Sequence, residues 1–135
     1  MDLITWTDRY SVGVKQIDDQ HKLLIDMINE LHAAMLSMQG KEALMTVLSK
    51  LANYCVTHFT LEEKLMRENG YPGYDEHKEK HTKMTLKVQQ LVGEVKSGKS
   101  TITIDVMNFL KNWLDMHIMG TDKQYGPFLN EKGVV

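Results

Sequence analysis

The stretch from residue 58 to residue 81 reads HFTLEEKLMRENGYPGYDEHKEKH, and it decides how the chain folds. Before the helix-breaking sequence NGYPG, His58 and Glu62 lie four residues apart. After it, His77 and His81 have the same spacing. Side chains four residues apart in a helix share one face, about 40° apart around its axis. The stretch therefore predicts two helices joined by a short turn, each with a pair of metal-ligand side chains, and chemistry between them.

The composition predicts a single domain. The chain has 135 residues, enough to bury one hydrophobic core and too few for two ordinary domains. It has 16 Lys and Arg against 18 Asp and Glu, a net charge of -2, so no basic surface for a nucleic-acid partner is indicated. Six histidines and ten methionines are the unusual counts.

The sequence also predicts a cytoplasmic location. The first eight residues, MDLITWTD, are too polar for the apolar core of a signal peptide, and no stretch approaches the length of a membrane span. The only cysteine, Cys55, excludes an internal disulfide framework and fits a reducing compartment. We therefore expect no insertion into a membrane.

The spacing of apolar residues predicts four helices. Alternating steps of four and three residues mark one inward seam in each of four segments, about 18–38, 41–69, 75–96 and 103–119. Residues 1–17 lack this periodicity and are predicted to form an arm. Residues 120–135, with three glycines and a proline, are predicted to form a short irregular tail. Long helices with short loops predict an all-α fold, an up-down-up-down antiparallel four-helix bundle in one domain of residues 1–135.

Polar side chains occupy core positions of these helices. Five of the six histidines and one glutamate fall on the predicted seams, namely His21, His58, His77, His81, His117 and Glu62. A buried carboxylate without a partner costs several kcal/mol, and unsatisfied imidazoles add to that cost. A metal centre satisfies both, because neutral imidazole and carboxylate are good ligands for first-row transition ions.

Asp122 extends the set at an irregular spacing. From His117 to Asp122 is a step of five residues, about 140° around a regular helix, so both point inward only if the helix ends or bulges between them. Gly120 lies where such a change can occur. Five imidazoles, two bridging carboxylates and a solvent-derived bridge fill roughly eleven of the twelve positions of two six-coordinate ions. One position stays open for a small ligand.

The chain resembles the hemerythrin family, particularly its bacterial single-domain members. The resemblance spans essentially the whole chain and is carried by HFTLEE at 58–63, the His77 and His81 pair, WL-x-x-HI at 113–118, His21 and Asp122. It implies two Fe ions in a non-haem, oxo- or hydroxo-bridged di-iron centre that binds dioxygen reversibly. By position, His77, His81 and His117 would hold the filled iron, His21 and His58 the iron with the open site, and Glu62 and Asp122 would bridge them.

The resemblance also implies an apolar ligand pocket, because water or excess protons would favour loss of the bound gas as peroxide. The residues that resemble the family's pocket lining are Leu24, Phe59, Trp113, Leu114 and Ile118. Met84 departs from the family pattern, which commonly has Phe three residues after the second histidine of the third helix.

We expect an oxygen carrier, store or delivery protein rather than an enzyme, a monomer whose partners are dioxygen and an oxygen-consuming enzyme. Two alternatives stay open, namely an oxygen or redox sensor and a di-iron enzyme acting on peroxide or nitric oxide. Among other metals, zinc favours fewer ligands and tetrahedral sites, and ferritin-like iron sites use Glu-x-x-His. The exposed ion pair expected from the spacing of Glu63 and Arg67 has no part in this function.

Overall fold

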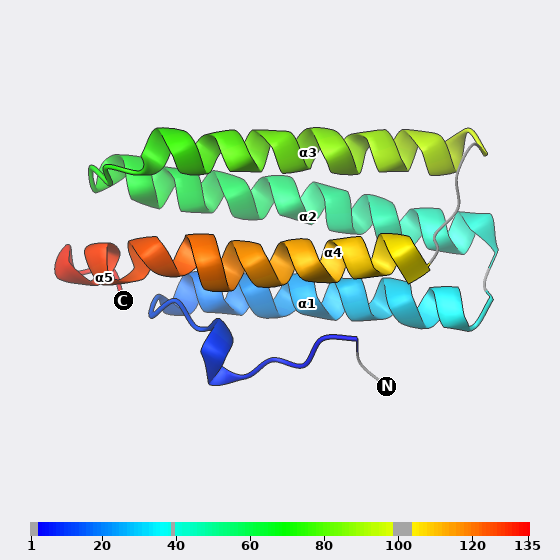
Figure 1. The fold of residues 1–135 in the computed structure, drawn as a ribbon, viewed down its shortest axis with the longest axis horizontal. Helices are drawn as coiled ribbons and strands as arrows, with labels where there is room; N and C mark the ends of the chain where they lie inside the picture. Colours follow the sequence, from blue (N-terminus) through cyan, green and yellow to red (C-terminus); the bar gives the residue numbers. More distant parts are fainter. Residues whose placement is uncertain (1–2, 39, 99–103) are drawn as a thin grey trace.

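The computed structural model describes residues 3–38, 40–98 and 104–135, and these contain helices and no strands. Four helices lie side by side and alternate in direction (Figure 1), namely α1 (Lys15–Leu36), α2 (Lys41–Glu68), α3 (Tyr74–Lys96) and α4 (Ile104–Met116). The predicted up-down-up-down four-helix bundle is confirmed. Residues 1–2 of the predicted arm and residue 103, the predicted start of the fourth helix, lie outside the described residues.

The turn between α2 and α3 forms where NGYPG predicts it. Gly70 takes a positive φ of 71°, a conformation that glycine adopts without a Cβ clash. The Tyr71 N–H then donates to the Met66 carbonyl oxygen at 2.9 Å, which satisfies one of the last carbonyls of α2. The hairpin therefore brings the end of α2 and the start of α3, with their two ligand pairs, to the same end of the bundle.

Helix α1 begins at Lys15, three residues before the predicted start at Asp18. The Asp18 carboxylate accepts hydrogen bonds from the Val12 N–H at 2.8 Å and from the Ser11 hydroxyl at 2.5 Å. Asp18 thus lies in the first turn of the helix and holds the arm against it, instead of marking the first helical residue. The arm, with the 3-10 helix η1 (Asp8–Tyr10), runs back along the bundle.

The prediction of an irregular tail after residue 119 was wrong. Helix α4 continues through a π-helix, η2 (His117–Asp122), into α5 (Lys123–Glu131). Tyr125, Gly126 and Leu129 on α5 are buried, while Pro127 is exposed on its outer side. A Cβ on Gly126 would collide with a backbone carbonyl of the arm, so glycine here permits close packing of α5 on the arm. This packing outweighs the low helix propensity of glycine and proline.

Among the described residues, no helix is both long enough and apolar enough to cross a membrane.

Candidate metal centre

The structure brings all seven predicted ligand side chains together at one end of the bundle. They come from α1, both members of the α2–α3 hairpin and η2, and each is at most 5% exposed. Their donor atoms form two groups, each with atoms within 4.8 Å of one another. One group is Glu62, His77, His81, His117 and Asp122, and the other is His21, His58, Glu62 and Asp122. The two carboxylates belong to both groups, as the predicted bridging role requires.

The π-helix η2 explains how His117 and Asp122 both reach the centre. In a π-helix the backbone hydrogen bonds join residues five apart, so a five-residue step returns to nearly the same face. His117 Nε2 lies 3.0 Å from Asp122 Oδ1. The bulge expected between them is present and spans all six residues from His117 to Asp122 rather than a break at Gly120.

The spacing of the donor atoms fits metal ligands better than mutual hydrogen bonds. Asp122 lies 2.9 Å from His77 Nε2 and 3.0 Å from His21 Nε2, and Glu62 lies 3.2 Å from His77 Nε2. Ligands about 2.1 Å from an octahedral ion are about 3.0 Å apart along each edge. Within the described part of the chain, no partner in hydrogen-bond geometry is found for five buried atoms, namely His58 Nε2, His77 Nε2, Glu62 Oε2 and both Asp122 carboxylate oxygens. A shared metal ion would satisfy these atoms together, because all of them belong to the two groups of closely spaced donors.

The carboxylates control protonation of the cluster. Burial lowers the pKa of His21 and of His77, but the adjacent Asp122 and Glu62 carboxylates outweigh burial and raise both pKa values to about 9. At His58 burial prevails and lowers the pKa. The imidazoles hold the pKa values of Glu62 and Asp122 well below the usual range against the opposing effect of burial. At neutral pH the two carboxylates are therefore balanced by protons on His21 and His77, and a metal ion must displace those protons.

Two side chains behind the predicted ligands orient the imidazoles. The Nδ1–H of His58 donates to Gln20 Oε1 at 2.7 Å, and the Nδ1–H of His81 donates to Glu63 Oε2 at 3.0 Å. In both residues the Nε2 lone pair is thereby left for the centre, the arrangement found behind histidines that bind metals.

The sequence reading missed both orienting residues and was wrong about Glu63, which contacts His81 instead of forming an exposed ion pair with Arg67. The sequence does place Gln20 and Glu63 next to the predicted ligands His21 and Glu62. Being adjacent in the chain does not predict which histidine each residue contacts, because the contact of Glu63 with His81 depends on the packing of α2 on α3.

Aromatic rings cover the histidines of the larger group. Phe59 stacks on His81 with ring centroids 4.0 Å apart, and Trp113 stacks on His117 at 4.8 Å. The Phe59 and Trp113 rings meet edge to face at 5.7 Å. The other predicted pocket residues, Leu24, Leu114 and Ile118, are buried in the core. Their assignment to a ligand pocket stays a prediction.

Tyr125 is a further neighbour of the centre. Its ring centroid lies 5.5 Å from that of His77, and its buried hydroxyl has no hydrogen-bond partner among the described residues. Burial and the nearby Asp122 and Glu62 carboxylates raise the pKa of the phenol well above its usual value, so Tyr125 stays neutral. The helix α5 that carries it is the segment predicted to be irregular.

The fold and the centre together define this chain as a four-helix-bundle protein with a buried cluster of imidazoles and carboxylates that could bind metal ions. A family model described as the hemerythrin HHE cation binding domain matches residues 12–129. The chain belongs to the hemerythrin family.

Named relatives and solved structures agree with this membership. The chain is 35% identical over 131 residues to a bacteriohemerythrin of Methylococcus capsulatus, covering 96% of this chain and 99% of the relative. It is 36% identical over 125 residues to one from Stenotrophomonas maltophilia, covering 93% and 80%. The crystal structure of a wild-type hemerythrin, 34% identical, superposes with a TM-score of 0.90 and covers 94% of this chain and 98% of that one.

Proposed function

We propose that this protein binds dioxygen reversibly at a non-haem centre of two iron ions, as an oxygen carrier, store or delivery protein. The observation that carries the proposal is the division of one buried cluster into a group of five donor residues and a group of four that share Glu62 and Asp122. The smaller group offers fewer donors from the protein, which leaves room on that side for a small ligand. Its relatives named bacteriohemerythrin support the same assignment.

In this proposal His77, His81 and His117 would hold one ion, His21 and His58 would hold the other, and Glu62 and Asp122 would be shared between them. Ferrous ions bound there would supply the electrons that dioxygen takes up. Gln20 and Glu63 keep two of the imidazoles in the orientation and tautomer that binding requires.

Exclusion of water favours reversible binding over turnover. The predicted ligands are almost completely buried, and the predicted pocket residues Leu24, Leu114 and Ile118 have apolar side chains that donate no proton. Excluding water and external protons would disfavour loss of the bound gas as peroxide. We propose with this function a monomer in the cytoplasm that supplies an oxygen-consuming enzyme.

The test is iron analysis combined with an air-cycled spectrum. We expect about two irons per chain after anaerobic loading with ferrous salt. Admitting air should produce a visible charge-transfer band, and sparging with inert gas should remove it over repeated cycles. A loaded protein whose spectrum does not change reversibly between air and inert gas would refute carriage.

The two alternatives give different results in the same preparation. Anaerobic stopped-flow mixing with hydrogen peroxide or nitric oxide should give one binding event per centre. Several turnovers per centre would instead identify an enzyme.

A further inference from the structure

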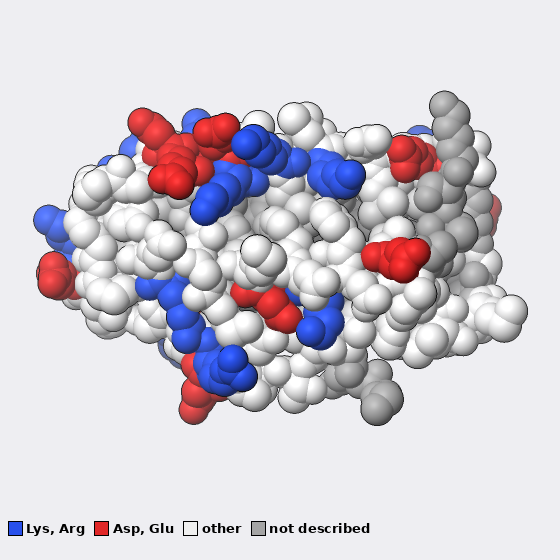
Figure 2. Space-filling view, viewed as in Figure 1, with Lys and Arg blue, Asp and Glu red and all other residues white. Residues whose placement is uncertain are grey.

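A groove with lysines on one side and apolar side chains on the other lies between α3 and α4. It has a volume of about 600 Å³, within the range of small-molecule sites. Lys80, Lys83 and Lys87 come from α3, three and four residues apart, so they form one row on one face of that helix. Figure 2 shows Lys and Arg side chains gathered over α3 on this face, next to uncharged surface towards α4.

The opposite side of the groove is an apolar row on α4. Phe109, Trp113 and Met116 follow one another at four and three residues, so they also share a face. Met116 is 73% exposed and Phe109 is 39% exposed, although both are large apolar side chains. Seven residues of helix span about 10 Å, so the lysine row and the apolar row face each other over about that length.

The lysines are held weakly enough to accept another partner. Lys80 donates to the Thr121 hydroxyl at 3.5 Å and the Lys87 ammonium lies 5.8 Å from the Phe109 ring, so both reach across the groove. Lys83 pairs with Glu79 on its own helix at 3.3 Å, and both side chains are well exposed. Exposed ion pairs of this kind contribute little, so a bound anion can replace them.

The charge of the groove is specific to this position. No acidic side chain is among its described lining residues, although the whole chain has a net charge of -2. The next hollow between the same helices, of about 340 Å³, has Glu94 and Asp105 in its lining beside Lys87. Acidic groups there repel an anion, so the favourable site ends at Lys87.

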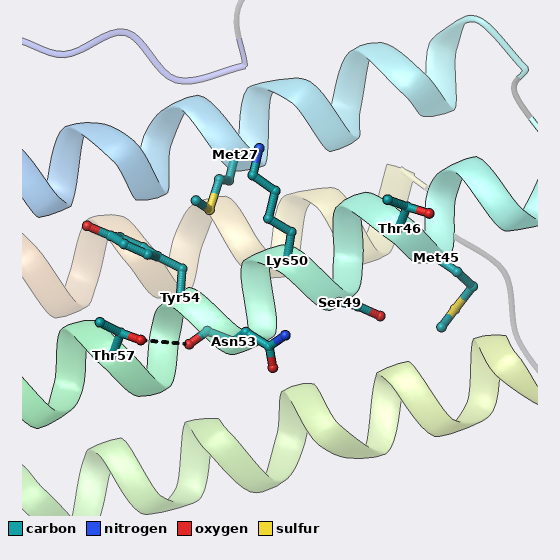
Figure 3. A pocket seen from close by; sticks show the side chains of 8 residues that line it. All are labelled: Met27, Met45, Thr46, Ser49, Lys50, Asn53, Tyr54 and Thr57. Carbon is teal, nitrogen blue, oxygen red and sulfur yellow. Dashed lines mark hydrogen bonds between the residues drawn. The ribbon is translucent and has the colours of Figure 1, made fainter.

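A hollow between α1 and α2 provides a comparison (Figure 3). Its volume is about 750 Å³, and its described lining is mostly hydroxyl, amide and thioether side chains, with Lys50 as the one lysine among them. Lys50 is already paired with Glu30 at 3.6 Å. The combination of several lysines with an exposed aromatic and methionine row therefore distinguishes the α3–α4 groove.

We propose that the α3–α4 groove binds a free amphipathic carboxylate, an acyl chain of medium length with one anionic head. The apolar body lies along Phe109, Trp113 and Met116, where it removes exposed apolar surface from water. The carboxylate meets the row of lysine ammonium groups. This site is separate from the predicted metal ligands, except that His117 lines the groove and Trp113 stacks on it. The proposal goes beyond dioxygen binding and does not depend on it.

The test is calorimetric titration of the purified full chain with decanoate below its micelle concentration, with decylamine as the matched cation. We expect about one saturable decanoate site per chain. Binding should weaken severalfold when salt is raised from low to about 1 M, because salt screens the lysines. Decylamine that binds as tightly as decanoate would overturn the proposal.

Variants locate the site. The double variant Lys83→Gln/Lys87→Gln should bind decanoate about tenfold more weakly, the effect of losing two charged contacts. Met116→Glu, which adds a like charge at an exposed position, should weaken it as well. Lys50→Gln should bind like the parent. Unchanged binding in the double variant, at an unchanged melting temperature, would overturn the site.

The source of the anion is tested with vesicles. Sedimentation with phosphatidylglycerol vesicles should leave the protein in the supernatant, because the groove takes a single free chain. Sedimentation with vesicles in the absence of saturable decanoate binding would overturn the proposal in favour of a lipid surface.

Discussion

Replacing Glu63 by leucine removes the acceptor behind His81 without touching any predicted ligand. The Nδ1–H of His81 donates to Glu63 Oε2 at 3.0 Å, and the Glu63 side chain is 20% exposed. In Glu63→Leu this N–H loses its partner, the ring is less firmly oriented, and Nε2 becomes a weaker donor to a metal ion. Glu63→Gln keeps an amide oxygen in reach and should have a smaller effect.

The expected loss follows from the contact. Hydrogen bonds to charged groups contribute about 1.5–3 kcal/mol, and partial exposure of Glu63 places this one towards the lower end. Partners behind a metal-bound histidine typically change metal affinity by about 10- to 100-fold, or about 1.4–2.7 kcal/mol. We therefore expect iron to bind at least about tenfold more weakly in Glu63→Leu.

The assay is competition for ferrous iron. The loaded protein is equilibrated under inert gas with increasing concentrations of a chelator, and the iron retained per chain is measured. His58→Ala, which removes a predicted ligand and leaves Glu62 poorly compensated, should lose iron most readily and melt at a lower temperature. Glu68→Gln, an exposed acid on the same helix, should match the parent. If Glu63→Leu retains iron like the parent while His58→Ala loses it, the orienting role is refuted.

Three further changes test other parts of the structure. Leu114→Ala should leave the iron content unchanged and speed autoxidation. It should also lower the free energy of unfolding by about 2–5 kcal/mol, because this leucine is 1% exposed. Leu86→Ala, at an exposed position, is the control for the melting temperature and the rate of air oxidation. Gly126→Ala should lower the melting temperature by forcing α5 off the arm, whereas Gly120→Ala, with open space around it, should not. Burial raises the pKa of the Cys55 thiol to about 12, compared with about 8.5 in an unfolded chain. Burial of the neutral thiol therefore contributes its full free energy of stabilisation below about pH 8.5, and this contribution is lost as the pH rises towards 12. A disulfide reagent at pH 8 should therefore react quickly with the unfolded protein only, and fast reaction of the native protein would contradict burial of this thiol.

Most of the helices of the bundle could be predicted from local patterns in the sequence. Helices and their inward seams follow from a periodicity that is read along the chain, because burial of one stripe of a helix is a local requirement. The same periodicity placed His21, His58 and His77 inside, where the structure has them. The five-residue step from His117 to Asp122 required that the helix end or bulge between them, since a regular helix cannot turn both residues inward, and the structure has the bulge.

Contacts between distant segments required the tertiary structure. Gly126 and Pro127 predicted irregular chain, yet α5 is helical because its buried face packs on the arm and the bundle, a gain that no local propensity includes. Glu63 appeared as an exposed partner of Arg67, but folding of the hairpin sets it against His81. The groove between α3 and α4 exists only because the packing of the helices places the apolar row of α4 beside the lysine row of α3. The sequence by itself determined which residues face inward, and only the packing of the helices decided which of them meet, because distances between residues far apart in the chain depend on where every helix lies.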